Sequence, residues 1–459
     1  MKAAAVIPLN ELSKLFYCLD RLGYAPVARM HFELRGGAID AERLRRACSL
    51  QLTRYPVFNA RCQDRSSAAA WRLCWVPGEN SERNGAVREY DLTGLTAGTA
   101  QQRVSALIAD ISAGLTAVRS RPFRLAVFRL PDCRWEIVAF FHHAAADAYS
   151  YNTFLTDIFS TYNRLGSGTG QTTPDTGRPH AETFPLLPVT AWETITGLWG
   201  AVCIIASQIR RRGGRLPHKL VYGKSSFNGG TGVVERCLGP DSLTRYAAAA
   251  RRLQTTVNDL LVAALIAALE QWKTTRGEPC ETISVQIHKN IRKTAAERRE
   301  MTNRFSTIII TTQKKERGSL TGIARQVSRL RASAYKRRMA EKIICFLWFL
   351  NSRVAEKTIV SWGNRILNNT VLGDSLAVSN MGTVRAGSDG GRLGSAEITA
   401  CYLYSPPIPS VGTSVSFCTF RKRLFLSFNY FTWALSEKQA HSFAAVYAGV
   451  LEKLVDSIP

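Results

Sequence analysis

Histidine, methionine and acidic residues are scarce in this chain of 459 residues. It has 7 His and 5 Met, and 35 Asp and Glu stand against 60 Lys and Arg, so the formal net charge is +25. A chain this basic is expected to meet an anionic partner such as a phosphate, a lipid surface, nucleic acid or an acidic carrier protein. The composition, with 46% hydrophobic residues, is that of a globular protein. It excludes collagen-like, disordered and small disulfide-stapled classes.

Metal-binding or redox spacings are missing among the 11 cysteines, because no Cys-x-x-Cys or Cys-x-x-His occurs. Most cysteines lie in apolar stretches such as 343–346, where a thiol behaves as a small hydrophobe. A reducing compartment, the cytoplasm, is therefore expected. The short apolar stretch before Glu11 and Lys14 has no clear cleavage site, and we interpret it as part of the mature chain.

Long hydrophobic runs are also missing, since none reaches the roughly 18 to 20 residues that a membrane-spanning helix needs. The segment 195–209 comes closest and is followed directly by Arg210, Arg211 and Arg212. This pattern fits a peripheral contact with an anionic membrane, with apolar residues in the acyl boundary and cations at the headgroups. A buried helix with a solvated basic end fits it equally well.

Hydrophobic periodicity predicts two sets of mixed elements. The first has helices over 11–20, 39–52, 101–113 and 149–165 and strands over 27–34, 123–130 and 135–141. The second has strands over 233–237, 283–288, 305–312, 375–379, 415–417 and 424–428 and helices over 242–253, 257–273 and 437–455. A Gly- and Pro-rich stretch at 166–188 separates them. We expect an N-terminal lobe (1–165), a linker with the apolar and basic segment (166–225) and a C-terminal lobe (226–459).

One motif carries chemistry: His142-His143-Ala-Ala-Ala-Asp147 ends an apolar strand and precedes a helix. Neighbouring residues of a strand point to opposite faces, so only one imidazole can face a given cleft. We expect His143 to be a general base, because its reference pKa of roughly 6.5 lies near working pH. His142 and Asp147 are catalytic candidates together with His143. His142 taken alone is expected to be a packed, hydrogen-bonded core residue, and Asp147 to fix the local geometry by pairing with an arginine. A metal site would need a third ligand, and no metal is expected.

The motif, in a basic chain with a central linker, resembles the HHxxxD acyltransferase and condensation-domain superfamily. This group includes chloramphenicol acetyltransferase, wax ester synthase/diacylglycerol acyltransferases and polyketide-associated acyltransferases. Further stretches are similar to elements of these relatives: 256–264, 285–292, 303–306 and 379–382. The sequence departs from their pattern at Thr302, where a glycine is expected, and at Arg304. The element typical of the plant acyltransferase branch is absent.

The resemblance implies an α/β (α+β) fold with two chloramphenicol-acetyltransferase-like lobes, mixed sheets flanked by helices and a tunnel between the lobes. It implies that His143 takes the proton of an acceptor hydroxyl or amine, which attacks an acyl thioester without a covalent acyl-enzyme. It also implies that Arg292 pairs with Asp147. Asn303, Ser306, Ser379 and Asn380 are candidates for substrate positioning or oxyanion contact. Ordinary strand-end or turn roles are the alternative for these four residues.

The leading hypothesis is an acyltransferase of lipid or natural-product biosynthesis. Its co-substrate would be acyl-CoA or the phosphopantetheine thioester of an acidic acyl carrier protein, with no bound cofactor. The basic clusters 210–212, 314–317 and 336–338 would dock the donor, or they are solvated helix faces. The alternatives are a freestanding peptide-synthetase-type condensation enzyme that forms amides and a catalytically silent recruitment module. Nucleic acid is not an expected partner, because no zinc-finger, RNA-recognition or helix-turn-helix signature occurs.

Overall fold

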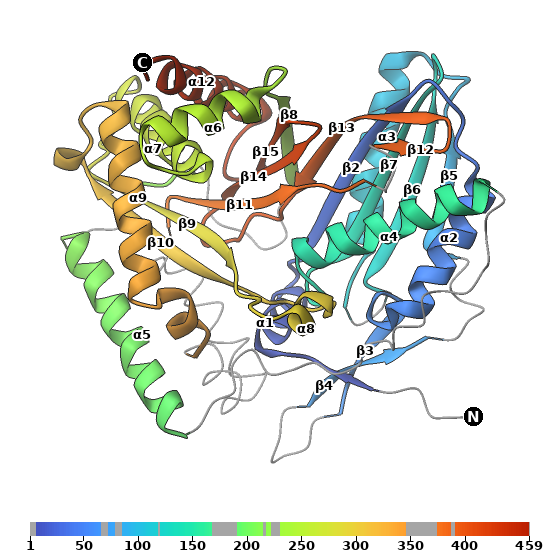
Figure 1. Cartoon of the computed structure of the whole chain (residues 1–459), viewed down its shortest axis with the longest axis horizontal. Coiled ribbons are helices and arrows are strands. Elements are labelled where there is room, and N and C mark those ends of the chain that lie inside the picture. Colours follow the sequence, from blue (N-terminus) through green and yellow to red (C-terminus); the bar gives the residue numbers. More distant parts are fainter. Residues whose placement is uncertain are drawn as a thin grey trace. The chain divides into compact units, whose positions relative to one another are not determined.

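The computed structural model describes residues 6–65, 72–78, 85–117, 120–167, 191–213, 217–221, 230–345, 374–386 and 391–458. The chain divides into two units, each an assembly of helices around a mixed sheet (Figure 1). The first unit comprises Met1–Leu186, Arg292–Arg304 and Thr383–Leu403, and the second comprises Leu187–Ile291, Phe305–Gly382 and Tyr404–Pro459. The predicted class, α/β with two lobes of mixed sheets flanked by helices, is confirmed.

The first unit is built on a six-stranded sheet with the strand order β12-β13-β2-β7-β6-β5. Its strands are β2 (Val27–Arg35), β5 (Val87–Asp91), β6 (Phe123–Leu130), β7 (Arg134–His142), β12 (Arg392–Leu393) and β13 (Ala396–Tyr404). Strands β1 (Ile7–Pro8), β3 (Ala60–Asp64) and β4 (Leu73–Pro77) form a second, three-stranded sheet. The helices are α1 (Glu11–Arg21), α2 (Ala41–Arg54), α3 (Ala97–Ala113), α4 (Ala148–Gly166) and α8 (Ala295–Arg299), with a 3₁₀ turn at Pro56–Asn59.

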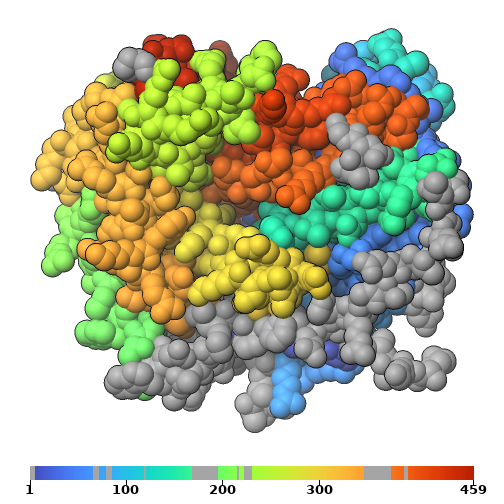
Figure 2. Space-filling model, in the orientation of Figure 1, coloured from blue at the N-terminus to red at the C-terminus, as the bar shows by residue number. Residues whose placement is uncertain are grey.

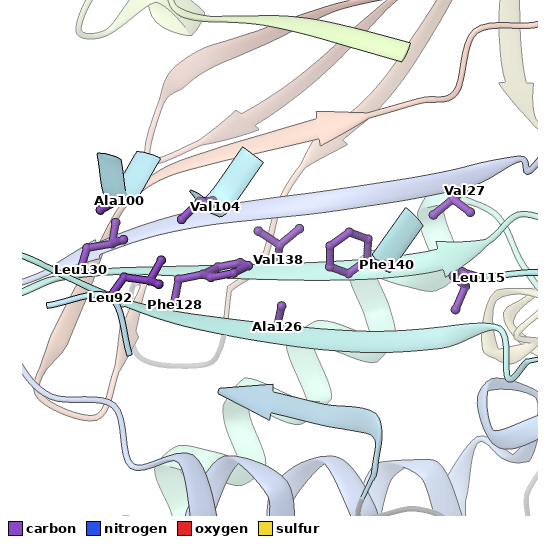
Figure 3. Packing of buried hydrophobic residues seen from close by; sticks show 10 residues of the cluster. All are labelled: Val27, Leu92, Ala100, Val104, Leu115, Ala126, Phe128, Leu130, Val138 and Phe140. Atoms are coloured by element: carbon purple, nitrogen blue, oxygen red, sulfur yellow. The ribbon is translucent and has the colours of Figure 1, made fainter. Parts of the chain in front are cut away.

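Both faces of this sheet are covered. Strands β5 and β6 are parallel, and α3 is the crossover that a parallel pair requires. Apolar residues of α3 pack on β6 and β7 in a core cluster, drawn in Figure 3, that includes Val104, Phe128 and Phe140. On the other face, Phe32 of β2 packs edge-to-face on Phe159 of α4 at 5.1 Å. The central strand β7 is therefore buried on both sides, which holds its C-terminal end in place.

The second unit has a six-stranded sheet with the order β10-β9-β11-β14-β15-β8. Its elements are α5 (Ala191–Arg211), β8 (Thr231–Cys237), α6 (Ser242–Arg252), α7 (Val257–Thr274), β9 (Thr282–Asn290), β10 (Phe305–Gln313), η3 (Lys314–Glu316), α9 (Leu320–Lys336), β11 (Leu376–Thr383), β14 (Thr413–Phe420), β15 (Arg423–Phe431) and α12 (Glu437–Asp456). Helix α7 is apolar and buried around most of its circumference, as a helix enclosed by neighbours must be. Among the described helices, none taken singly is long and apolar enough for a membrane span; α6 and α7, which meet at 90°, pass that test only as a pair.

The division between the units is not a single cut along the chain. Two segments that the sequence placed in a continuous C-terminal lobe, Arg292–Arg304 and Thr383–Leu403, belong to the first unit. The second of these adds β12 and β13 to the first sheet, where Thr399 donates to the Glu33 carbonyl at 3.2 Å. Hydrogen-bonding edges, rather than sequence order, decide which sheet a strand joins. The predicted boundary at 166–188 lies almost wholly outside the described residues.

Candidate active site

The His-His-x-x-x-Asp motif sits where β7 passes into α4. The N–H of His142 donates to the Pro122 carbonyl at 2.7 Å, and that of His143 donates to the Pro26 carbonyl at 2.8 Å. A turn follows, closed by a hydrogen bond from Ala145 N–H to the His142 carbonyl at 3.0 Å. The motif backbone is thus held by the segments that lead into the two neighbouring strands, β6 and β2. A site built at such a strand end has little conformational freedom.

His142 is a packed core residue, as the sequence predicts. Its side chain is 0% exposed. The Ala144 N–H donates to its Nδ1 at 3.2 Å, and its Nε2 lies 3.6 Å from Asp20 Oδ1. A ring held in this way stabilises the turn that presents the next residue.

Of the two histidines of the motif, His143 is the one that remains partly exposed. Phe16, on α1, stacks on its ring with a centroid separation of 4.0 Å and an interplanar angle of 12°. Its Nδ1 lies 3.2 Å from Asn303 Oδ1. The stacked phenyl ring and the amide fix both the plane and the rotation of the imidazole.

Asn303 fixes the tautomer of His143 as well as its position. The Asn303 Nδ2 donates to the His143 carbonyl at 2.7 Å and to Ser13 Oγ at 3.1 Å. Its Oδ1 therefore faces the ring, and an amide oxygen accepts only. Nδ1 of His143 must carry the proton in the neutral ring, so the lone pair lies on Nε2. This is the form of histidine that accepts a proton.

Burial of the ring lowers the pKa of His143 from its ordinary 6.5 to about 4. The hydrogen bonds of the ring and the charge of Asp147 oppose this shift without cancelling it. The imidazole is neutral at physiological pH, because the folded protein protonates it only as the pH falls toward 4. Its Nε2 is consequently ready to act as a base.

Asp147 forms a buried ion pair with Arg292. Arg292 Nη1 donates to Asp147 Oδ2 at 2.6 Å, and Nη2 donates to Oδ1 at 3.1 Å. Both side chains are almost completely buried, at 1% and 7% exposure. The structure thus brings together the two residues that the family resemblance pairs. A bidentate pair of this kind is the strong, geometrically specific form of the interaction.

The same carboxylate also starts a helix and holds a loop. Asp147 is the N-cap of α4, where it accepts from the Ser150 N–H at 3.1 Å, and it accepts from the Arg304 N–H at 2.8 Å. Burial by itself would raise the pKa of Asp147, but Arg292 and the two N–H groups lower it on balance. Asp147 stays ionised and braces the segment that carries Asn303.

Thr302 and Arg304, the two residues at which the sequence departs from the family pattern, both form hydrogen bonds within the first unit. Thr302 Oγ1 accepts from the Asn10 side chain at 3.0 Å, and its carbonyl accepts from Arg292 at 2.7 Å. Arg304 is buried and donates from Nε to Glu300 Oε2 at 2.5 Å. These contacts place Asn303 between two anchored residues.

Sequence reasoning missed the contribution of α1. Asn10, its N-cap, donates to the Asn303 carbonyl at 2.8 Å and accepts from the Ser13 N–H at 2.9 Å. Ser13 and Phe16 then reach Asn303 and His143. The helical period predicted α1, and Asn10 is a typical N-cap residue, but no local signal connects this helix with a motif about 130 residues away.

Ser306, Ser379 and Asn380 lie in the second unit. Ser306 is buried, and its hydroxyl donates to the Ala340 carbonyl at 2.6 Å. Asn380 is exposed; its side chain donates to Asn258 Oδ1 at 3.3 Å and accepts from the Gly382 N–H at 2.9 Å. These contacts suit strand-end and turn roles, and a substrate contact by these residues stays a prediction.

The predicted basic docking clusters are only partly open to solvent. Arg212 is buried against Asp374 at 2.8 Å, Arg211 pairs with Glu316 at 3.1 Å, and Arg317 is buried against Glu270 at 3.0 Å. These three cations already have carboxylate partners within the second unit. Residues 336–338, in contrast, are exposed at the end of α9. Among the described residues, no group of three or more His, Cys, Asp or Glu side chains is placed to hold a metal ion.

Comparisons with known proteins identify a family model and solved structures that are similar to this chain. Residues 23–183 match the family model of the condensation domain. The first condensation domain of the calcium-dependent antibiotic synthetase, solved with a substrate analogue, has a TM-score of 0.72 at 15% identity, over 100% of this chain and 98% of that chain. Trichothecene 15-O-acetyltransferase TRI3 from Fusarium sporotrichioides has a TM-score of 0.70 at 10% identity, over 95% and 94%.

A third similar structure is a mutant starter condensation domain of rhizomide synthetase RzmA, solved with C8-CoA and Leu-SNAC. It has a TM-score of 0.66 at 12% identity, over 99% of this chain and 95% of that chain. No match among curated proteins was found. At these identities the likeness to the solved structures establishes the fold alone. The motif lies within the residues that match the condensation-domain model.

The depressed pKa of His143 predicts an unusual titration. In an NMR titration of the imidazole resonances, those of His143 should stay unchanged from about pH 8 down to about pH 5.5, where an imidazole in solvent becomes protonated. The unfolded chain binds a proton at this residue below about pH 6.5 and the folded chain does not, so His143 reduces stability as the pH falls toward 4. A His143 midpoint near 6.5 would contradict the packing around the ring.

The buried ion pair predicts a large loss of stability in Asp147→Ala. Removing the carboxylate leaves Arg292 buried without its charge partner, which should cost about 3–5 kcal/mol of unfolding free energy in urea denaturation. Asp456→Ala is the matched control, because its pair with Arg245 at 3.0 Å is exposed and should be worth less than about 1 kcal/mol. Asp147→Asn retains the N-cap and provides a milder variant if the alanine protein does not fold. Equal losses in Asp147→Ala and Asp456→Ala would refute the bracing role.

Proposed function

The chain has the fold of the condensation-domain and acyltransferase superfamily, and on this premise we propose that it is an acyltransferase. It moves an acyl group from an acyl thioester to a hydroxyl or amine acceptor. The observation that carries the proposal is the state of His143: a neutral, partly exposed imidazole whose Nδ1 faces Asn303 and whose lone pair lies on Nε2. This geometry is that of a general base.

In the proposed reaction, Nε2 of His143 takes the proton of the acceptor O–H or N–H. The acceptor oxygen or nitrogen attacks the thioester carbonyl and forms the new C–O or C–N bond. The C–S bond breaks as the tetrahedral intermediate collapses, and the thiolate receives the proton from Nε2 and leaves as a thiol. The neutral ring is restored, and no acyl group is attached to the protein. Asp147 and Arg292 position the site without touching the substrate.

The known neighbours support thioester chemistry. The RzmA domain was solved with a CoA thioester and an aminoacyl thioester analogue, and TRI3 is named as an O-acetyltransferase. We propose acyl-CoA or the thioester of an acidic carrier protein as donor, in cytoplasmic natural-product or lipid biosynthesis. The exposed cations at 336–338 suit either donor, since both are anionic.

Amide formation between carrier-bound partners is the second candidate. The match to the condensation-domain model over residues 23–183 favours it specifically. It uses the same base, because His143 would take the proton of the attacking amine instead of that of a hydroxyl. The two candidates differ in the acceptor that supports thiol release. A silent recruitment module would release no thiol with any acceptor.

His143→Ala should abolish most turnover while the fold persists. We expect thiol release from a panel of acyl-CoA and acyl-carrier-protein thioesters, with alcohol and amine acceptors, to fall by roughly 10²–10⁴-fold. His441→Ala is the control, because this histidine is exposed on α12 and far from the motif in sequence. A rate in His143→Ala equal to that of His441→Ala would remove the general-base role, and no thiol release by the wild-type protein would favour the silent module.

Asn303→Asp tests how the tautomer is held. A carboxylate 3.2 Å from Nδ1 would stabilise the imidazolium, so the pKa of His143 should rise. The acid limb of kcat/KM should then move to higher pH, because a larger fraction of the base is protonated at a given pH. Measuring the full pH profile separates this effect from a general structural defect, which lowers the rate at every pH. An unshifted limb would show that Asn303 does not govern the titration of the ring.

A further inference from the structure

Helix α5 buries small residues and Ile204 on one face and exposes several large apolar residues on the other. Gly197, Gly200 and Ala201 are buried. The exposed fractions of the outward residues are 61% for Ile195, 70% for Trp199, 45% for Val202 and 40% for Ile209. An ordinary amphipathic helix of a globular protein exposes polar residues on its outward face instead. Figure 2 shows α5, in green, at the surface of the face in view.

The inward face fixes this orientation. A Cβ at Gly197 would come within 2.7 Å of the Cys345 side chain, and one at Gly200 within 2.8 Å of the Lys342 side chain. The helix therefore lies so close to residues 342–345 that only small side chains fit between them. Rotating α5 to bury Trp199 would push large side chains into this contact. The outward stripe is a fixed feature of the fold.

The charges around the stripe are arranged for an anionic surface. Residues 195–209 contain no charged side chain, and the helix ends in the exposed Arg210. Arg211 is tied to Glu316 of η3, which brings the exposed Lys314 and Lys315 to the same end of α5. Arg212 is buried against Asp374, so it is not available to a partner. Of the described cations at this end of α5, Arg210, Lys314 and Lys315 are exposed, and Lys314 also lies 3.9 Å from Glu281.

We propose that α5 lies in the plane of an anionic lipid surface, with Ile195, Trp199 and Val202 in the acyl boundary. Arg210 and the lysines of η3 would contact the lipid phosphates. A stripe over 15 residues is about 22 Å long, which suits a helix lying in the interface. A second copy of the chain is the less favourable occupant, because both copies carry a charge of +25. This inference does not depend on the reaction at His143.

Co-sedimentation of the full chain with vesicles tests the proposal. One set of vesicles contains phosphatidylcholine alone, and the other contains phosphatidylcholine with phosphatidylglycerol. The wild-type protein should bind the anionic set, and the double variant Trp199→Ser, Val202→Ser should bind it at least about tenfold more weakly.

Leu95→Ser is the control variant. It removes an apolar residue of the first unit that is 38% exposed, and it should bind like the wild type. Arg210→Ala should weaken only the binding to anionic vesicles, and added salt should mask its effect.

Three results would overturn the proposal. The first is that the wild-type protein stays in the supernatant with both vesicle sets. The second is that the double variant binds the anionic vesicles as tightly as the wild type. The third is a dimer in sedimentation velocity that the double variant dissociates, which would make the stripe a contact between two copies. Circular dichroism melts of all variants show whether each one retains the fold.

Discussion

A buried carboxylate, Asp147, holds the candidate site together. It ends the motif turn, caps α4 and binds both the Arg292 guanidinium and the Arg304 N–H. These bonds tie the segment 292–304 to a turn that lies more than a hundred residues earlier in the chain. Asn303, within that segment, is thereby brought to Nδ1 of His143. Through Asn303, the charge of Asp147 thus decides which nitrogen of the imidazole can accept a proton.

Burying the Asp147–Arg292 pair limits its contribution to stability, and enclosing His143 lowers its basicity. Both features fix the geometry of the site. Burying a charged pair costs desolvation free energy that its attraction barely repays, so the pair contributes specificity of structure more than net stability. Enclosing His143 costs basicity, because its pKa falls to about 4. In return the ring is neutral, carries one defined tautomer and is held by Phe16 and Asn303. Preorganisation of this kind is what general-base catalysis requires of a scaffold.

Local patterns predicted most of the elements and the core of the motif. The period of apolar residues indicated β7 and α4, and the junction between them placed His142 and His143 at a strand end. The sequence did not indicate that 292–304 and 383–403 join the first unit, because a strand's alternation says nothing about which sheet edge it pairs with. The contributions of Phe16 and Asn10 to the site were missed for a related reason. A helical period identifies the buried face of a helix, but it does not show which residues pack against that face. Arg211, Arg212 and Arg317 were interpreted as candidate docking residues, since a basic run does not reveal which cations pair with carboxylates of the same chain.

The pH dependence of kcat/KM of the wild-type protein tests the central claim most directly, because it reports the protonation of the free enzyme. If His143 is the base and is enclosed as described, kcat/KM stays level from about pH 8 down to about pH 5.5. An acid limb centred near pH 6.5 would mean that the essential imidazole is solvated, and it would contradict the assignment of a packed, preorganised base.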